Sequence, residues 1–215
     1  MNPLLEEISA ALQNGKAKKV KELIENALSE GIPAQEILQQ GLMSGMDIIA
    51  VKFKNNEVYV PEVLLAARAM NTGTALLKEG LAGSGAKPLG KCVLGTVKGD
   101  LHDIGKNLVR MMLEGKGIEV IDIGIDVPYE TFVEAVQNEK PDIVAMSALL
   151  TTTMDEIKHT IDALVAGGVR DGVIIMVGGA PVTPEFCKKV GADLYAPDAA
   201  TAADAAKQAL LDKAV

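Results

Sequence analysis

Residues 92–105 read Cys-Val-Leu-Gly-Thr-Val-Lys-Gly-Asp-Leu-His-Asp-Ile-Gly, and this stretch decides how the second half of the chain folds. The apolar run 92–97 predicts a buried strand, and Gly105 predicts the opening of the next helix. Asp100 and His102 then lie in the loop between strand and helix. A carboxylate two residues before a histidine suits an imidazole that binds a metal through one nitrogen while the carboxylate holds the other.

The alternation of strand and helix continues to the end of the chain. Short apolar runs predict strands at 91–97, 118–123, 142–147, 173–177 and 193–195. Helical spacing is found at 105–116, 129–139, 153–166, 183–190 and 199–213. Apolar strands separated by helices predict a parallel sheet that is covered on both faces. The expected fold class is α/β, with a five-stranded flavodoxin-like or Rossmann-like domain over residues 91–215.

Residues 1–82 have a helical pattern throughout and predict a four-helix bundle. Asn2 is a good N-cap and Pro3 suits a first turn, so the first helix is expected to begin there and to end at Gly15. Three further helices are marked by apolar positions at 20–28, 33–49 and 61–77. Short connections favour an antiparallel arrangement. Residues 83–90 are rich in Gly, Ser and Pro and are expected to form a linker that limited proteolysis cuts first.

The composition excludes several classes of protein. The formal net charge is −8, from 21 basic and 29 acidic residues, so the chain lacks the basic field that binds nucleic acid or anionic membranes. No run approaches the roughly 18 apolar residues of a transmembrane helix, and the first residues lack the basic region of a signal peptide. We therefore expect a cytoplasmic protein that binds neither nucleic acid nor membranes. The two cysteines, Cys92 and Cys187, form no CxxC motif.

Two further signals follow later strands of the predicted sheet. Ser147-Ala-Leu149 comes after the third strand, and Gly178-Gly179 comes after the fourth. In a flavodoxin-like sheet of order 2-1-3-4-5, strands one, three and four are neighbours, so these loops and the Asp100 loop are expected to border one crevice. Glycines there let a ligand pass close to the backbone. The Ser147 hydroxyl is expected to bind either a polar ligand group or Asp100.

The three signals together resemble the cobalamin-binding fingerprint of methionine synthase, of base-off mutases and of the small corrinoid proteins of methanogens and acetogens. In this chain the fingerprint reads Asp100-x-His102-x-x-Gly105, Ser147-x-Leu149 and Gly178-Gly179. The two gaps, of 41 residues and 28 residues, are similar to those of the family. Residues 53–70 look like the end of the helical cap of such proteins, so the resemblance covers nearly the whole chain.

The resemblance implies a corrinoid cofactor with cobalt at its centre. His102 takes the position of the lower cobalt ligand, and Asp100 holds the second ring nitrogen, so that protonation of this pair is linked to methyl transfer. Phe53 and Val60 take the positions of the apolar residues over the upper face of the ring. The other residues expected to contact the cofactor lie in the loops: Asp103, Ile104, Gly105, Ser147, Leu149, Thr151, Gly178 and Gly179.

The function that the resemblance implies is methyl transfer between partner proteins. The chain would accept a methyl group on cobalt(I) from a substrate-specific methyltransferase and hand it to a second methyltransferase acting on tetrahydrofolate or a thiol coenzyme. A reductive activase is a third expected partner. Such a chain is not a complete enzyme. The methyl donor stays open among methanol, methylamines, betaines and methoxylated aromatics.

Three other functions remain as alternatives. The first is the cobalamin subunit of an adenosylcobalamin mutase, which the helical N-terminal half disfavours because a barrel covers the upper face in mutases. The second is a cobalamin-dependent sensor, which would need a DNA-binding module for which this chain has neither spare length nor basic charge. The third is a flavodoxin-like module without a corrinoid, which would stay colourless after reconstitution with hydroxocobalamin.

Overall fold

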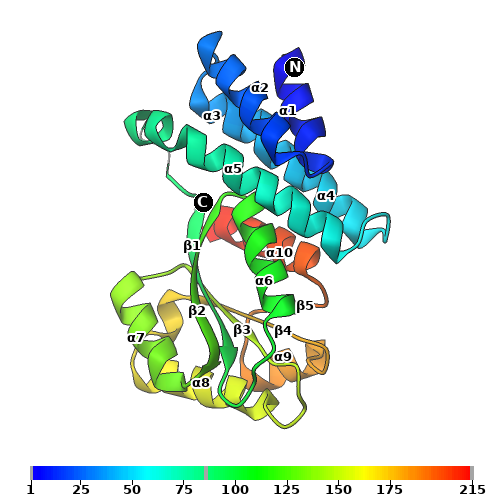
Figure 1. Ribbon diagram of the computed structural model, residues 1–215. Coiled ribbons are helices and arrows are strands. Elements are labelled where there is room, and N and C mark those ends of the chain that lie inside the picture. Colours follow the sequence, from blue (N-terminus) through cyan, green and yellow to red (C-terminus); the bar gives the residue numbers. More distant parts are fainter. Residues whose placement is uncertain (1, 85–86, 214–215) are drawn as a thin grey trace. The chain divides into compact units, whose positions relative to one another are not determined.

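The computed structural model describes residues 2–84 and 87–213, which divide into two compact units (Figure 1). One unit comprises Met1–Lys87 with Gly115–Gly117, and the other comprises Pro88–Glu114 with Ile118–Val215. The predicted linker, 83–90, includes residues 85 and 86, which lie outside the described residues. Helix α5 includes residues 83 and 84 of this range, and strand β1 begins at its last residue, Gly90.

The second unit is built on a five-stranded parallel sheet with the strand order β2-β1-β3-β4-β5. Its strands are β1 (Gly90–Val97), β2 (Ile118–Val127), β3 (Ile143–Ser147), β4 (Ile174–Gly178) and β5 (Leu194–Ala196). Its helices are α6 (Ile104–Gly115), α7 (Tyr129–Glu139), α8 (Met154–Ala166), α9 (Pro184–Val190) and α10 (Ala199–Lys213), with a short 3-10 turn η2 at Arg170–Gly172. The predicted fold class and strand order are confirmed. One strand differs: β2 runs four residues beyond the predicted end at residue 123.

Alternating side chains of the central strands build the main core of this unit. One face of the sheet contributes Val93, Val97, Val144, Met146, Ile175 and Val177, which cluster with buried residues of α7, α8 and α9. Because successive side chains of a strand point to opposite faces, Leu94 and Thr96 point to the other face. Both of them are buried as well. The sheet is therefore covered on both sides, as its near-continuous apolar strands predict.

Within its described residues, the first unit consists of helices joined by short loops. Its elements are α1 (Pro3–Gln13), α2 (Ala17–Ser29), α3 (Ala34–Glu36), the π-helical segment η1 (Ile37–Met43), α4 (Ser44–Lys54) and α5 (Val60–Ser84). The Asn2 side chain accepts a hydrogen bond from the Leu4 amide at 3.0 Å, so the predicted N-cap is confirmed. The third predicted helix is α3, η1 and α4 in succession. The core of this unit is aliphatic, and Leu5, Ile8 and Leu12 of α1 are fully buried in it.

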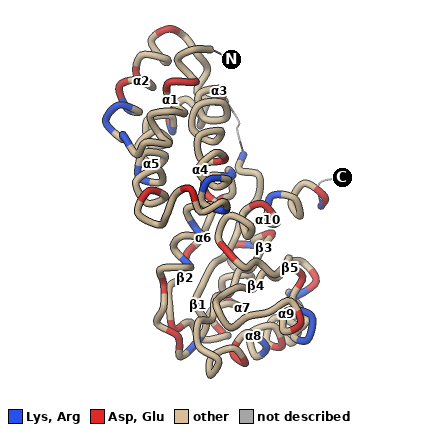
Figure 2. The backbone as a smooth tube through the Cα atoms, turned by 90° about the vertical axis from the view of Figure 1, so that its right-hand side faces the viewer, with Lys and Arg blue, Asp and Glu red and all other residues tan. Residues whose placement is uncertain are grey.

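Charged side chains are distributed along both units. Figure 2 shows acidic and basic residues interspersed over the helices and the loops. Within residues 2–84 and 87–213, no helix combines the length and the apolar composition that a membrane crossing requires.

Both cysteine thiols are buried and are expected to be unreactive in the folded protein. Burial raises the pKa of Cys92 in β1 to about 12 and also raises the pKa of Cys187 in α9. The thiolate is the form that reacts, so an aromatic disulfide reagent at about pH 8 should modify neither thiol quickly before unfolding. Both thiols should react at once in concentrated guanidinium. Rapid modification in native buffer would contradict this packing.

Candidate functional site

The loop between β1 and α6 places Asp100 inside the protein and His102 at its surface. Asp100 is fully buried, whereas half of the His102 side chain is exposed. The loop turns back on its own strand, because the Thr96 hydroxyl donates to the His102 carbonyl oxygen at 2.9 Å and the Asp100 amide donates to the Val97 carbonyl oxygen at 3.2 Å. Asp100 and His102 are only two positions apart, yet one is buried and the other is exposed to solvent.

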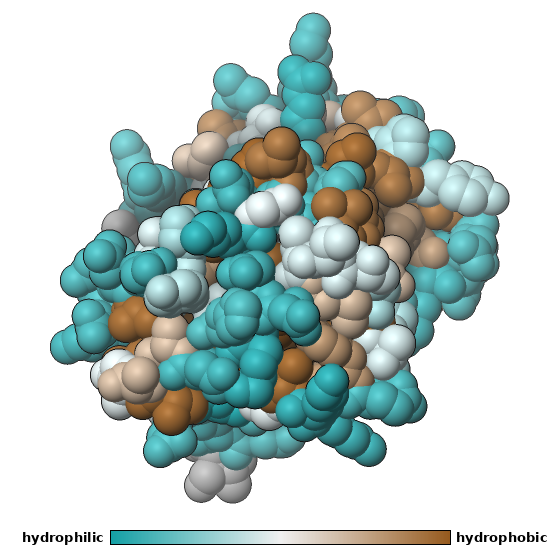
Figure 3. Space-filling view, turned by 90° about the horizontal axis from the view of Figure 1, so that it is seen from below, coloured by the Kyte–Doolittle hydropathy of each residue, from teal (hydrophilic) through white to brown (hydrophobic). Residues whose placement is uncertain are grey.

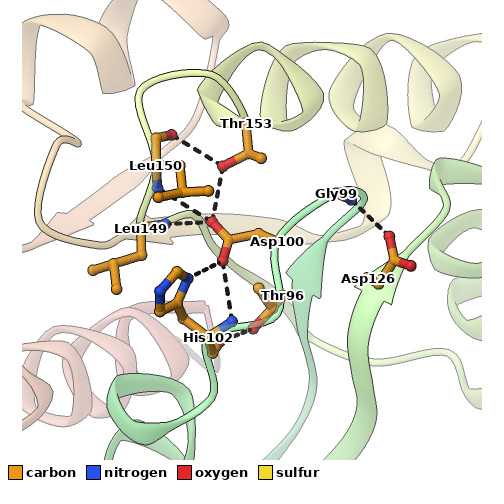
Figure 4. Close-up of polar contacts among 8 residues, drawn as sticks. All are labelled: Thr96, Gly99, Asp100, His102, Asp126, Leu149, Leu150 and Thr153. Atoms are coloured by element: carbon orange, nitrogen blue, oxygen red, sulfur yellow. Dashed lines mark hydrogen bonds and ion pairs between the residues drawn. The ribbon is translucent and has the colours of Figure 1, made fainter.

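Every oxygen of the Asp100 carboxylate is hydrogen bonded (Figure 4). Oδ1 accepts from the His102 ring at Nδ1, 2.7 Å away, and from the His102 amide at 3.1 Å. Oδ2 accepts from the amides of Leu149 at 2.7 Å and Leu150 at 3.2 Å, and from the Thr153 hydroxyl at 2.8 Å. The carboxylate thus joins the loop after β1 to the loop after β3.

These hydrogen bonds decide the charge of Asp100. Burial alone would raise its pKa, because desolvation penalises the charged form. The bonds from the Leu149 amide, from the ring and amide of His102 and from the Thr153 hydroxyl outweigh burial and hold the pKa of Asp100 well below its usual range. Asp100 is therefore an anion at physiological pH, and it can only accept hydrogen bonds.

The charge of Asp100 fixes the orientation of the imidazole. Because the carboxylate only accepts, Nδ1 of His102 carries the ring proton and Nε2 keeps its lone pair. Metal-binding histidines commonly donate their second N–H to a carboxylate in this way. Within residues 2–84 and 87–213, no group of three or more His, Cys, Asp or Glu side chains is placed to hold a metal ion. His102 thus presents one ring nitrogen, Nε2, that can bind a metal.

The surroundings of His102 suit the edge of a flat apolar ligand. Leu101 is 67% exposed and Ile104 is 73% exposed, and Leu149 and Leu150 in the facing loop are also exposed. A side chain at Gly105 would meet no atom within 4 Å, so the space beside the first turn of α6 is open. Apolar side chains also reach the surface in the view of Figure 3, between polar ones. The residues present therefore fit a corrinoid, which has methyl groups among the amide side chains at its ring edge and a cobalt that an imidazole nitrogen can bind.

The predicted signals after β1, β3 and β4 do lie at one edge of the sheet. Thr96 is in register with Ser147, and Ser147 is in register with Gly178. The structure corrects one expectation, because the hydroxyl that binds Asp100 belongs to Thr153 and not to Ser147. Ser147 ends β3 with its side chain pointing to the same face of the sheet as Thr96, so a polar ligand group remains the expected partner of its hydroxyl.

The physical reason for glycine differs among the three positions of the motifs. Gly179 has φ +127°, and a Cβ there would lie 1.9 Å from the Ala148 carbonyl oxygen, so the fold itself requires glycine. A Cβ at Gly178 would lie 3.2 Å from the Ala196 carbonyl oxygen. Gly105 has neither constraint. Space for a ligand therefore remains the main explanation only for the glycine at position 105.

The remaining predicted contact residues are accessible. Asp103 and Thr151 are exposed, and Asp103 accepts a hydrogen bond from the Asn107 side chain at 3.1 Å. Phe53 near the end of α4 and Val60 at the start of α5 are partly exposed and belong to the helical unit.

Replacing Thr153 with valine should lower the unfolding free energy of the protein measurably. Valine has nearly the same shape but removes the hydroxyl that binds a buried, charged carboxylate, and the expected loss is about 1–3 kcal/mol of unfolding free energy. Thr153→Ser is the matched control, because it keeps the hydroxyl. Urea unfolding of the two variants makes the comparison, and equal stability would show that this bond contributes nothing.

Comparison with known proteins gives the family. A B12 binding domain model matches residues 90–206, and a second B12 binding domain model matches residues 4–78. The chain is 43% identical to dimethylamine corrinoid protein 3 of Methanosarcina acetivorans over 97% of both chains. It is 43% identical to the trimethylamine corrinoid protein of Methanosarcina barkeri over 88% of both chains.

A solved structure agrees with this result. A chain of the methanol:cobalamin methyltransferase complex from Methanosarcina barkeri superposes with a TM-score of 0.89 at 32% identity. The match covers 98% of the present chain and 80% of that chain. Both halves of the sequence are thus accounted for by one kind of protein, and the alternative of a flavodoxin-like module without a corrinoid is excluded. The chain belongs to the B12-binding family of corrinoid proteins, and a corrinoid is its cofactor.

Proposed function

We propose that the protein carries a methyl group on its corrinoid from a substrate-specific methyltransferase to a second methyltransferase. The observation that carries this proposal is the His102 imidazole, which Asp100 holds at Nδ1 while Nε2 remains free. The likeness to a chain of a methyltransferase complex supports the first of the two partners. The second methyltransferase, on tetrahydrofolate or a thiol coenzyme, and a reductive activase complete the proposed set of partners.

The bound corrinoid would supply a cobalt that accepts a methyl group and gives it up again. His102 would hold this cobalt through Nε2, and Asp100 would keep the imidazole in the orientation that binding needs. When Nε2 does not ligate cobalt, it can take up a proton, and the resulting cation faces the Asp100 carboxylate at 2.7 Å. The amides of Leu149 and Leu150 and the Thr153 hydroxyl keep that carboxylate in place throughout.

The other predicted residues would surround the cofactor. Ile104, Gly105 and Leu149 would border the corrin ring, where their exposed surface is otherwise unused. Polar contacts would come from Asp103, Ser147 and Thr151, and Gly178 and Gly179 would border the entry of the nucleotide tail. In the helical domain, residues 1–82, Phe53 and Val60 would cover the upper face and keep water from it. Residues 91–215 would form the cobalamin-binding domain.

The proposed methyl donor is a methylamine. Relatives with more than 40% identity over most of this chain include a dimethylamine corrinoid protein and a trimethylamine corrinoid protein. The chain of the methanol system is 32% identical. We therefore place the chain beside an amine methyltransferase rather than a methanol methyltransferase.

Methylation of the reconstituted protein tests this assignment. The protein is loaded with hydroxocobalamin, reduced to cobalt(I) and mixed with an amine methyltransferase or a methanol methyltransferase, each with its own substrate. The visible spectrum reports methylation. We expect methylation with dimethylamine or trimethylamine and the matching enzyme, and at least about tenfold slower methylation with methanol. Methylation by the methanol system alone would overturn the proposed donor.

A further inference from the structure

The end of strand β2 is irregular, and this irregularity lies beside the His102 loop. The register of β2 against β1 shifts twice, first between Leu94 and Gly95 and again between Gly95 and Val97. Two residues of β2 have positive φ within this stretch, Gly124 at +99° and Asp126 at +52°. β-Bulges re-aim side chains and are frequent next to active sites.

Asp126 holds the start of the loop. Its carboxylate accepts a hydrogen bond from the Gly99 amide at 2.6 Å, and its own amide donates to the Asp100 carbonyl oxygen at 2.9 Å. Strand β1 ends at Val97, so these two bonds extend the contact of β2 beyond the strand and into the loop. Figure 4 shows the first of them, between Gly99 and Asp126. The left-handed backbone of Asp126 is uncommon for a residue with a side chain, and such conformations cluster at functional sites.

Asp122 holds the end of the loop. Its Oδ2 forms an ion pair with the Lys106 ammonium, whose residue is only 4% exposed, and its Oδ1 accepts from the Gly124 amide at 3.0 Å. Lys106 also donates to the Asn107 side chain at 3.2 Å. Lys106 is in the first turn of α6, four residues after His102. One five-residue segment of β2, residues 122–126, therefore binds the loop on both sides of the imidazole.

A buried ion pair fixes the positions of its two side chains, but it adds little to the free energy of unfolding. Removing two charges from water offsets most of the attraction between them, so Lys106 and Asp122 contribute little net free energy by pairing. The pair does require one position of the ammonium and hence one position of the α6 first turn. Between the two anchors, Leu101, His102 and Ile104 are exposed. The bonds from Thr96 and Asp100 to His102 hold the middle of the loop, and the two anchors hold its ends.

We propose that residues 122–126, here called the β2 clamp, position His102 for cobalt by holding the loop at Gly99–Asp100 and at Lys106. This inference rests on the proposed role of His102 as the cobalt ligand. Asp122, Asp126 and Lys106 are positioning residues and touch neither cobalt nor the methyl group. Loosening either anchor should leave the protein folded but let the imidazole leave its ligating position for part of the time.

Two variants separate the clamp from the general stability of the fold. Asp126→Gly removes the acceptor for the Gly99 amide but keeps a residue that adopts φ +52° without strain. The double variant K106M/D122N removes both charges together, so neither is left buried without the other, and it keeps an acceptor for the Gly124 amide. Arg110, which also lies 3.5 Å from Asp122, keeps its ion pair with Glu114. The control is Lys158→Met, which removes an exposed ion pair with Asp162 on α8, outside the loop.

Amide hydrogen exchange of the cofactor-free protein is the first measurement. The His102 amide is bonded to Asp100 Oδ1, so its exchange reports how often the loop opens. We expect it to exchange about tenfold faster in both clamp variants, at unchanged exchange of the core amides of β3. Lys158→Met should match the wild type. Unchanged exchange of the His102 amide in both clamp variants would overturn the proposal.

The cobalt(II) EPR spectrum of the loaded protein is the second measurement. Nitrogen splitting from His102 should be complete in the wild type and absent in a fraction of the molecules of each clamp variant, although these variants still retain the corrinoid. Undiminished splitting in both variants would overturn the clamp, whatever the exchange rates. If the wild type itself shows no splitting that His102→Ala removes, the proposed ligand role fails instead, so the two failures are distinguishable.

Discussion

His102→Ala should remove the nitrogen splitting from the cobalt(II) EPR spectrum and slow methyl transfer by at least about 100-fold. Nε2 of His102 is the proposed cobalt ligand. Mutating even a residue that only hydrogen bonds to a metal ligand lowers metal affinity or activity by about 10–100-fold. The variant should stay folded, because half of this side chain is exposed. Asp100 keeps its bonds to Leu149, Leu150 and Thr153.

The second histidine provides the control. His159 lies on the exposed face of α8, where its ring is 3.2 Å from the Glu156 carboxylate. His159→Ala should therefore change neither the splitting nor the rate of methyl transfer. A His102→Ala protein that kept the wild-type EPR spectrum would show that another nitrogen, such as the base of the cofactor, ligates cobalt.

Gly179→Ala should destabilise the protein severely. A Cβ there would lie 1.9 Å from the Ala148 carbonyl oxygen and 2.8 Å from its carbonyl carbon, and alanine at φ +127° is strained in any surroundings. The obstacle is backbone at the end of two neighbouring strands, so it cannot rotate away as a side chain would. Backbone strain and overpacking together should cost more than about 3 kcal/mol of unfolding free energy.

Gly105→Ala is the matched substitution with the opposite expectation. A Cβ at Gly105 meets nothing within 4 Å, and alanine favours a helix more than glycine does. Its unfolding free energy should be unchanged or up to about 1 kcal/mol higher. Corrinoid binding should be weaker, because the methyl group enters the space proposed for the ring. Urea unfolding and titration with hydroxocobalamin measure the two effects, and a stable Gly179→Ala protein would contradict the geometry at Ala148.

Local sequence patterns predicted most of the α/β unit. The apolar runs of β1, β3 and β4 are bounded by polar or glycine residues, so their ends could be placed within about one residue. The order of the strands followed from the fold class. Strand β2 was the exception, because its last residues include Gly124 and Asp126, which have a low preference for strands. Hydrogen bonds to Gly99 and Asp100 hold them in place, and no local pattern shows those bonds.

The reasons for individual motif residues were harder to predict than their presence. Gly105 and Gly179 look equivalent in the sequence, yet only the second is required by a neighbouring backbone. Ser147 stood in the expected motif, whereas the hydroxyl on Asp100 came from Thr153, six residues further on. Thr153 is the last residue of the cluster 151–153, which consists of three consecutive threonines. Which of its three threonines turns inward depends on the path of the loop after β3.

The sequence by itself determined the cofactor class, through its resemblance to a known fingerprint, and it also determined the contact between Asp100 and His102, because these residues lie two positions apart in one loop. Only the tertiary structure decided what keeps that pair in place. The donors to Asp100 Oδ2 stand 49 to 53 residues away along the chain, and the Lys106–Asp122 pair spans 16 residues. Contacts over such separations arise from strand order and loop path, which are properties of the folded chain as a whole.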